Sequence, residues 1–199
     1  MPLIPRLSLP DMRADLQQYL GPRVARLKYL GELFQCIGHA PGVLLSFMHF
    51  TDALKDALPD PLTEAAVLTT ATLMNNRYER NQHERLSIRL GYSAEWIAEV
   101  EALKPEAAHH MSDDEIAVQR YTIAAIESRG LKVHAEFEAM TKRLGPAQAV
   151  AIVMLVGRYI THAVAVNTLG LAPPVPSIFE DGFRGDGAPP KNAQQEIKP

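Results

Sequence analysis

The chain has 199 residues, of which 47% are hydrophobic and 22% are charged, and its formal net charge is −3. This length supports one domain with its own core, and the slightly acidic balance leaves no basic surface for a phosphate backbone, so we expect no nucleic-acid partner. No uncharged apolar run reaches about 18 residues, and the N-terminus lacks an apolar signal core. We therefore predict neither a membrane span nor a signal peptide.

The single cysteine, Cys36, excludes an intrachain disulfide and fits a reducing cytoplasm, which is where we expect the protein to be. We interpret Cys36 as a buried hydrophobic residue. The pair His109-His110 lacks a third ligand at a suitable spacing, so we predict no metal site there.

Proline, glycine and capping residues divide the first third of the chain into predicted helices. Asp11 can cap a short helix that ends at Leu20-Gly21, and Pro22 can begin the next. A further helix starts at Pro41. Asp60 followed by Pro61 provides an N-cap and a favourable first position for the central segment. The predicted helices before that segment are 11–20, 22–37 and 41–58.

The second half of the chain shows the same punctuation. Ser93 begins a short helix, and Ser112-Asp-Asp-Glu115 forms a capping box before a helix that stops near Gly130. Gly145 then separates two more helices, 133–144 and 146–169. No stretch alternates in polarity with a period of two, so the predicted fold class is all-α. We predict one helical domain over 1–172.

From Ala172 onward, proline and glycine leave no helical period, so residues 173–199 are predicted to form an extended tail. Such a segment needs a surface to hold it. We expect a neighbouring subunit to provide that surface, with Val175, Ile178, Phe179 and Phe183 as anchors.

The central segment, 64–91, joins an apolar helix to a polar one. Residues 65–74 carry no charge, and Asn76, Glu79 and His83 follow. At about 100° per residue, these three side chains share an arc of roughly 60° on one helix. Buried polar groups need partners. We therefore predict that the three residues form one functional face.

Glu64 joins this face only if the segment breaks, because on one straight helix it lies roughly 22 Å from Glu79. Asn75 and Asn76 favour a break, since their side chains compete for backbone hydrogen bonds. The break brings Glu64 towards His83. It also places Asn76 and Glu79 in a first helical turn, where the helix dipole favours anions.

The spacing Glu64-x11-Asn76-x2-Glu79-x3-His83 resembles the carboxymuconolactone decarboxylase / alkylhydroperoxidase-D superfamily. The peroxidase branch of that superfamily has cysteines at the positions of Asn76 and Glu79. The decarboxylase branch is similar in placing a glutamate four residues before the histidine. The resemblance therefore implies the decarboxylase-like branch, with Glu64 and His83 in one site.

Two flanking pieces, His39-Ala-Pro41 and Gly157-Arg158-Tyr159 with the later Asn167, also resemble family features, so the likeness covers roughly residues 30–172. It implies an all-helical bundle that assembles as a homo-oligomer, a trimer or a hexamer. An Arg-Tyr pair followed by His occurs both at 77–83 and at 158–162. This echo indicates a possible internal duplication.

Decarboxylation of a small oxo-acid needs a proton donor at carbon, and no cofactor is required when the substrate's own carbonyl takes up the charge. His83 suits proton delivery because its reference pKa lies near neutrality. Glu79, one turn earlier, could orient the imidazole or move protons itself. The predicted catalytic residues are Glu79, His83 and Glu64.

The predicted substrate-binding residues are Asn76, Arg80, Tyr159 and His162. Asn76 could donate to an oxyanion, and Arg80 could fix a substrate carboxylate. Each has a plainer interpretation: the arginines as a solvated charged face, and His162 as a satisfied core group. Tyr78 points to the opposite face of a regular helix, where it packs or serves an adjacent site.

Three functions remain open. The favoured one is a cofactor-independent lyase or isomerase that acts on a small anionic lactone or oxo-acid from aromatic breakdown, by decarboxylation, isomerisation or hydration. A peroxidase is disfavoured because only Cys36 is available as a thiol. The third is a non-catalytic oligomeric protein that binds a small molecule.

Overall fold

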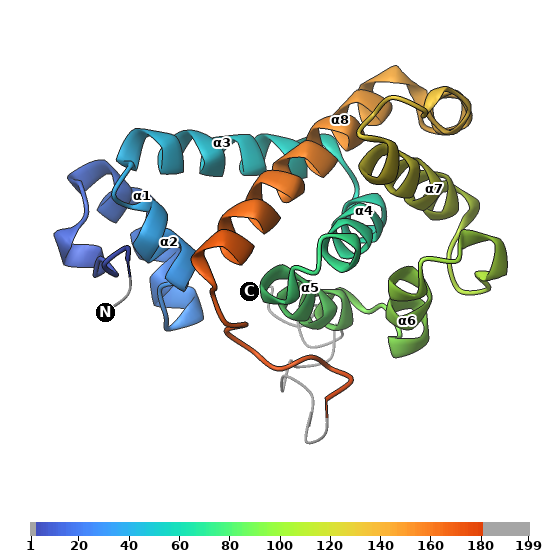
Figure 1. Ribbon diagram of the computed structural model, residues 1–199. Helices are drawn as coiled ribbons and strands as arrows, with labels where there is room; N and C mark the ends of the chain where they lie inside the picture. Colours follow the sequence, from blue (N-terminus) through green and yellow to red (C-terminus); the bar gives the residue numbers. More distant parts are fainter. Residues whose placement is uncertain (1–2, 181–199) are drawn as a thin grey trace, which may run out of the picture.

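The computed structural model describes residues 3–180, and every regular element within that range is helical. The all-α fold class is therefore confirmed. Figure 1 shows α1 and α2 at one end of the molecule, α6 and α7 at the other, and α4 with α5 between them. The helices are α1 (Ala14–Leu27), α2 (Glu32–Ile37), α3 (Pro41–Ala57), α4 (Asp60–Leu73), α5 (Arg77–Leu90), α6 (Ala94–Ala102), α7 (Asp113–Ser128) and α8 (His134–Leu169), with short 3₁₀ turns at Leu9–Asp11 and Pro105–Ala107.

Helix α4 forms the centre of the core and packs against α5, α6, α7 and α8. Every residue from Leu62 to Ala71 is buried, as the uncharged stretch predicts. Val67 on α4 belongs to the same apolar cluster as Val118 on α7 and Ile152 on α8. Each such side chain contributes about 1.5–3 kcal/mol when fully buried, so α4 is fixed on several sides.

The predicted break after α4 is present. Asn75 adopts a left-handed conformation with φ of 49°, and the Asn76 N–H donates to the Ala71 carbonyl at 2.7 Å. Asn76 then becomes the N-cap of α5, where its Oδ1 accepts from the Glu79 N–H at 3.2 Å. The two helices pack against each other, and this hairpin turns Glu64 towards α5.

Most predicted helix ends agree with the structure. Ser93 and Ser112 cap α6 and α7 through their side chains, and Ser112 forms the expected capping box with Glu115. Gly145 interrupts α8 with φ of 78°, and Pro146 begins its apolar second part. Asp60 differs slightly, because it is the first residue of α4 and Pro59 holds the capping position.

The predicted division at Gly21-Pro22 is wrong, because α1 runs through both residues. Leu16 and Leu20 are fully buried on the same face, so their packing holds the helix together where the proline removes a backbone donor. The chain leaves the helix at Lys28, which has φ of 66°. The prediction that Asp11 caps α1 is also wrong, because it ends the preceding 3₁₀ turn and α1 begins at Ala14.

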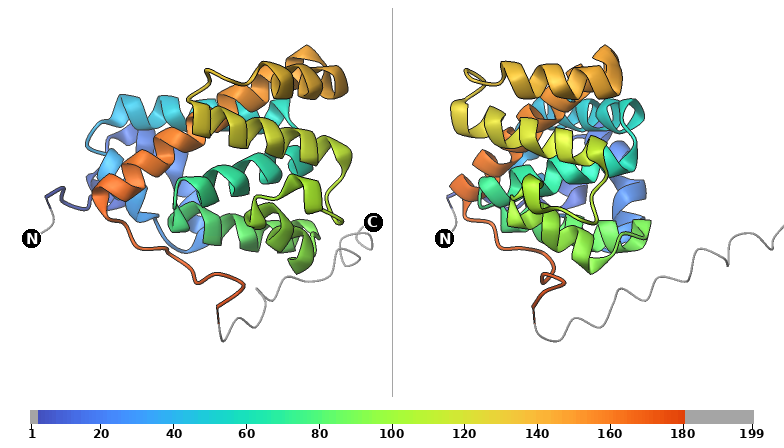
Figure 2. Two further views of the ribbon diagram at one scale, coloured as in Figure 1. Left: turned by 45° about the vertical axis from the view of Figure 1, so that its right-hand side comes forward. Right: turned by 90° about the vertical axis from the view of Figure 1, so that its right-hand side faces the viewer.

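Within residues 3–180, α8 alone is long and apolar enough to cross a membrane. More than half of that apolar stretch is buried inside the protein, as in the core helix of a soluble protein. Both views in Figure 2 show α8 lying across the other helices. Its second part is continuous from Pro146 onward, unlike the broken α4–α5 pair. Internal duplication and homo-oligomer assembly stay predictions.

The segment after α8 returns along α5 of its own chain, which is also visible below the green helices in Figure 1. Asn81 donates to the Val175 carbonyl at 2.9 Å, and Arg85 donates to the Pro176 carbonyl at 3.0 Å. Ile178 packs beside the Trp96 cluster, whereas Phe179 is half exposed. The described part of the tail is therefore held by its own subunit, contrary to our expectation, and Phe183 lies outside the described residues.

Candidate active site

The four polar groups of the predicted motif meet in one hydrogen-bonded row. Nδ1 of His83 lies 2.8 Å from Oε2 of Glu64, and Nε2 lies 3.1 Å from Oε2 of Glu79. The other Glu79 oxygen, Oε1, lies 2.7 Å from Nε2 of His162. Asn76 closes the row, with Nδ2 3.2 Å from Nδ1 of His162. The hairpin thus brings Glu64, Glu79 and His83 together, and α8 adds His162.

The cap of α5 defines the tautomer of neutral His162. Because Oδ1 of Asn76 accepts from the Glu79 backbone, its Nδ2 faces the imidazole and donates to Nδ1. Nε2 of His162 then carries the hydrogen and donates to Glu79. A residue that begins a helix therefore also orients the second histidine.

His83 is held between two carboxylates. Burial by itself lowers its pKa, but the charge of Glu64, the neighbouring Tyr159 and the hydrogen bonds to Glu64 and Glu79 raise the pKa well above its ordinary value. Both ring nitrogens have acceptors within hydrogen-bond distance. The surroundings of His83 therefore favour the protonated imidazolium over the neutral ring.

Glu79 responds in the opposite direction. Burial raises its pKa, but the electrostatic interaction and hydrogen bond with His162, followed by those with His83, lower the pKa well below the ordinary value. Ser87 donates to the carboxylate of Glu64 at 3.3 Å. The row thus combines a histidine whose surroundings favour protonation with a carboxylate that stays ionised.

Tyr159 contributes its hydroxyl, which lies 3.2 Å from Nε2 of His83, on the same side as Glu79. Burial raises the pKa of this phenol, so the hydroxyl keeps its proton and can donate. Tyr159 and His162 follow one another on the buried face of α8. Both predicted contacts from this helix therefore lie at the site.

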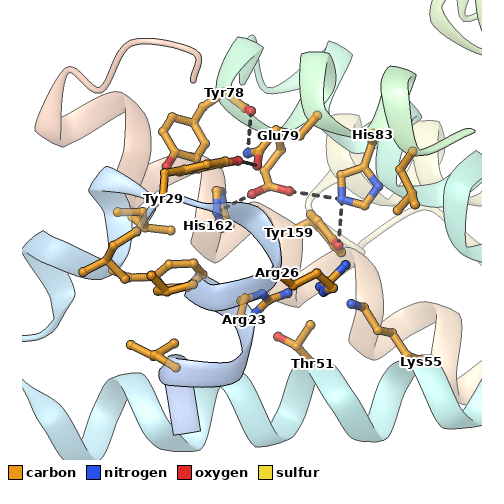
Figure 3. A pocket seen from close by; sticks show the side chains of 18 of the residues that line it. Arg23, Arg26, Tyr29, Thr51, Lys55, Tyr78, Glu79, His83, Tyr159 and His162 are labelled. Atoms are coloured by element: carbon orange, nitrogen blue, oxygen red, sulfur yellow. Dashed lines mark hydrogen bonds and ion pairs between the residues drawn. The ribbon is translucent and has the colours of Figure 1, made fainter. Parts of the chain in front are cut away.

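A cavity of about 230 Å³ opens beside the row. Glu79, His83, Tyr159 and His162 line it, together with Tyr78. Figure 3 shows the Glu79 carboxylate between the two imidazoles. Arg23, Arg26 and Lys55 gather on the opposite side in the same view. A small molecule in this space would meet proton-transfer groups on one side and cations on the other.

Two of the predicted substrate residues do not line the cavity. The first is Asn76, whose amide is used by the cap of α5 and by His162. The second is Arg80. Its Nε lies 3.4 Å from Oε1 of the fully buried Glu84, on the side of α5 that faces the returning tail. From its position on α5, the Arg80 side chain could extend either towards the cavity or towards Glu84. The buried carboxylate of Glu84 attracts the guanidinium. Tyr78 differs from expectation too, because it lines the cavity as well as packing.

The cationic side of the cavity was missed by sequence reasoning. Its residues come from α1, α3 and α8, which no local motif connects. One signal was available: Arg158 lies in an apolar helix beside Tyr159 and one turn before His162. A charged residue in such a buried register needs a functional or structural partner.

Cys36 lies in a cluster with Leu33 and Val166 and does not line the cavity. Burial raises the pKa of this thiol, which makes it less reactive. His109 and His110 bind the partly buried Glu99 instead of each other. Among residues 3–180, no group of three or more His, Cys, Asp or Glu residues could hold a metal ion.

No protein-family model matches the chain, and no curated protein matches its sequence. Solved structures do match. An uncharacterized peroxidase-related protein from Ralstonia eutropha JMP134, described as an alkylhydroperoxidase AhpD core, is 18% identical over 90% of this chain and 92% of its own, with a TM-score of 0.72.

Two further structures extend the comparison. The debrominase Bmp8 without ligand is 12% identical over 87% of this chain and 92% of its own, with a TM-score of 0.74. A protein of unknown function from Agrobacterium tumefaciens, described as a putative antioxidant defence protein AhpD, is 15% identical over 70% of this chain and 96% of its own, with a TM-score of 0.64. At these identities, the likeness identifies the fold of the chain as alkylhydroperoxidase-D-like, as the sequence resemblance predicted.

Proposed function

We propose that the protein is a cofactor-independent lyase that decarboxylates a small anionic oxo-acid or lactone by Glu/His acid–base chemistry. The observation that supports this most directly is the position of His83 between the carboxylates of Glu64 and Glu79 at the edge of a cavity. A site prepared to give a proton suits a reaction whose intermediate is a carbanion.

The proposed step breaks the bond between the carboxylate carbon and its neighbour. The bonding electrons pass into the substrate's conjugated carbonyl, and CO₂ leaves. The Tyr159 hydroxyl donates a hydrogen bond to the resulting enolate oxygen. His83 delivers its Nε2 proton to the carbon, and solvent protons restore the imidazolium. Glu64 and Glu79 favour the protonated imidazole again after each turnover.

The Bmp8 debrominase has also been solved as a cysteine-to-alanine variant in complex with 2,3,4-tribromopyrrole, 14% identical over 85% of this chain and 90% of its own, with a TM-score of 0.70. An enzyme of this fold therefore handles a small organic ligand, which supports an enzymatic role for this chain. A thiol-based reaction fits the site less well. Asn76 and Glu79 occupy the motif positions, and Cys36 lies outside the cavity.

A turnover screen tests the proposal. Purified protein treated with a chelator and a thiol-blocking reagent is incubated with small oxo-acid and lactone carboxylates, and CO₂ release is followed. We expect turnover in the wild type and a loss of about 10²–10⁴-fold in His83→Ala, the range for general acid–base catalysis. Glu79→Gln should also lose activity.

The pair Glu99–His110, with 2.7 Å between Oε1 and Nδ1, offers a matched control away from the cavity. Glu99→Gln should leave turnover unchanged. Turnover that is indifferent to His83→Ala and Glu79→Gln would contradict acid–base catalysis. Tight binding of a small acid without turnover would instead favour the binding-protein alternative.

A further inference from the structure

We propose that Arg158, with Arg23 and Lys55 beside it, forms a carboxylate subsite that anchors the substrate across the cavity from the Glu79–His83 pair. This subsite rests on the proposed function, because it describes how the same cavity holds its substrate. The carboxylate bound there is one that survives the reaction. An arginine paired with the departing carboxylate would stabilise the ground state and oppose the loss of CO₂.

The guanidinium of Arg158 is held in a fixed orientation. Its central carbon lies 4.1 Å from the centre of the Tyr159 ring and 4.5 Å from the centre of the Phe47 ring. Its Nε donates to Oγ1 of Thr51 at 3.0 Å. A planar guanidinium fixed in this way has lost its rotational freedom before any ligand arrives, which favours tight binding of a planar anion.

Arg158 has no counter-ion in the described part of the chain. The residue is only 7% exposed, its Nη1 is buried without an acceptor, and none of the ion pairs within residues 3–180 includes it. A buried charge without a partner is costly, and proteins usually compensate it. Because Arg158 lines the cavity, a bound carboxylate can supply the missing partner.

Arg23 and Lys55 are two of the further cations that line the same space. Arg23 contacts the Phe34 ring and the Met48 sulfur, and it makes no ion pair within the described residues. The pKa of Lys55 is lowered by loss of solvation, then by the charge of Arg23 and, further, that of Arg158. Asp52 partly opposes this, although its carboxylate already accepts from Tyr19. Cations that destabilise one another are stabilised together by an anion.

The distances limit the ligand to a small one. The Tyr159 ring centre lies 4.1 Å from the Arg158 guanidinium carbon and 5.5 Å from the His83 ring centre. The guanidinium therefore lies no farther from His83 than these two lengths combined. A molecule with a carboxylate and a carbonyl two or three carbons apart spans that gap. The carboxylates of Glu79 and Glu64 would repel a second anion that binds in reverse.

Calorimetry with an inert pair of ligands tests the subsite on the full chain. The ligands are 4-oxopentanoate and its neutral analogue 4-oxopentanamide, which keep the same carbon skeleton. We expect the wild type to bind the acid at least tenfold more tightly than the amide. Arg158→Gln should abolish that preference, and Arg158→Lys should restore part of it. Arg120→Gln, an exposed arginine on α7, should behave as the wild type.

Thermal unfolding provides the second measurement. Because Arg158→Gln removes an unpaired buried charge, the variant should unfold at the wild-type temperature or above it, and 4-oxopentanoate should stabilise only the wild type. If Arg158→Gln does not fold, Lys55→Gln provides the test, because Lys55 is exposed. Lys55→Gln should weaken binding of the acid severalfold. Equal binding of acid and amide by the wild type, or an unchanged preference in Arg158→Gln or a folded Lys55→Gln, overturns the subsite.

The inert ligands separate this result from the proposed function. A protein that binds 4-oxopentanoate through Arg158 but turns over no acid keeps the subsite and loses the lyase function. A protein that turns over an acid without regard to Arg158 keeps the function and loses the subsite.

Discussion

Oε1 of Glu79 lies 2.7 Å from Nε2 of His162, while Oε2 of the same carboxylate lies 3.1 Å from Nε2 of His83. One carboxylate therefore bridges two imidazoles that come from different helices. Both rings therefore depend on the position of the same carboxylate. A change at either ring should be detectable at the other.

The first prediction concerns the source of the high pKa of His83. Glu64 provides the largest favourable interaction with the imidazolium, so Glu64→Gln should move the His83 titration to lower pH. The ¹³C and ¹⁵N chemical shifts of the imidazole, followed against pH, measure this directly. Glu99→Gln should change the imidazole chemical shifts of His110 and leave those of His83 unchanged. An unmoved His83 titration in Glu64→Gln would show that Glu64 does not set its protonation.

The second prediction separates the two roles of Asn76. Asn76→Ala should destabilise the protein by about 1 kcal/mol, the usual cost of a lost N-cap, and should release the tautomer of His162. Asn76→Asp should keep the cap but remove the donor to His162. Urea unfolding measures the stability, and imidazole ¹⁵N shifts measure the tautomer.

Ser112→Ala is the matched control for Asn76, because it removes the cap of α7 away from the cavity. It should cost a similar stability without changing the His162 signals. If Asn76→Asp leaves the His162 tautomer unchanged, the amide of Asn76 does not determine it.

The third prediction concerns Glu101, whose pKa is raised to about 8 by burial and then by the charge of Glu84, against the opposing effect of Arg80. The folded state therefore holds a proton that the unfolded chain releases near its ordinary value of about 4.5. The stability from this proton is fully present below about pH 4.5 and is lost as the pH rises through about 8. Glu101→Gln should flatten this decline, measured as the free energy of unfolding from pH 4 to 9.

Glu84 also holds the returning tail, since it accepts from the Ser177 hydroxyl at 2.5 Å and the Ile178 N–H at 2.7 Å. Ser177→Ala should lower stability by about 1 kcal/mol and leave the pH dependence in place. An equally steep decline of stability with pH in Glu101→Gln would exclude Glu101 as its source.

The fourth prediction concerns the interruption of α8 at Gly145. Its φ of 78° is unfavourable for other residues, and a Cβ built there meets no atom within 4 Å. Gly145→Ala should therefore cost about 1–2 kcal/mol through backbone conformation alone. Gly157→Ala, later in the same helix and equally free of contacts, should instead stabilise by up to about 1 kcal/mol. Chemical denaturation compares the two variants. If Gly145→Ala has the same free energy of unfolding as the wild type, the positive φ at position 145 is not needed for stability.

Much of the hydrogen-bonded row could be predicted because its residues are local in sequence. The uncharged run before Asn75 and Asn76 indicated a buried helix followed by a break, and a break is sufficient to bring Glu64 to His83. Capping residues such as Ser112 locate helix ends because they satisfy backbone groups that neighbouring turns leave free. These are short-range effects that a single sequence contains.

The remaining features depend on packing between distant segments. Arg80 follows Glu79 in the sequence, but its guanidinium pairs with the buried carboxylate of Glu84 and does not line the cavity. The α1 helix continues through Pro22 because tertiary contacts of Leu16 and Leu20 outweigh a local breaker. The path of the tail and the position of Arg158 likewise follow from which surfaces meet, which helical periodicity does not specify.

Because the chain folds back at Asn75, the two sides of the cavity come from different parts of the sequence. Glu64, Glu79 and His83 belong to the α4–α5 hairpin, whereas Arg158 and Lys55 come from α8 and α3. Under the proposed function, substitutions at Arg158 and Lys55 should change which acid binds while Glu64, Glu79 and His83 are retained. We expect related chains to differ in substrate preference before they differ in reaction type. An engineer could keep the α4–α5 hairpin and redesign the cationic side of the cavity.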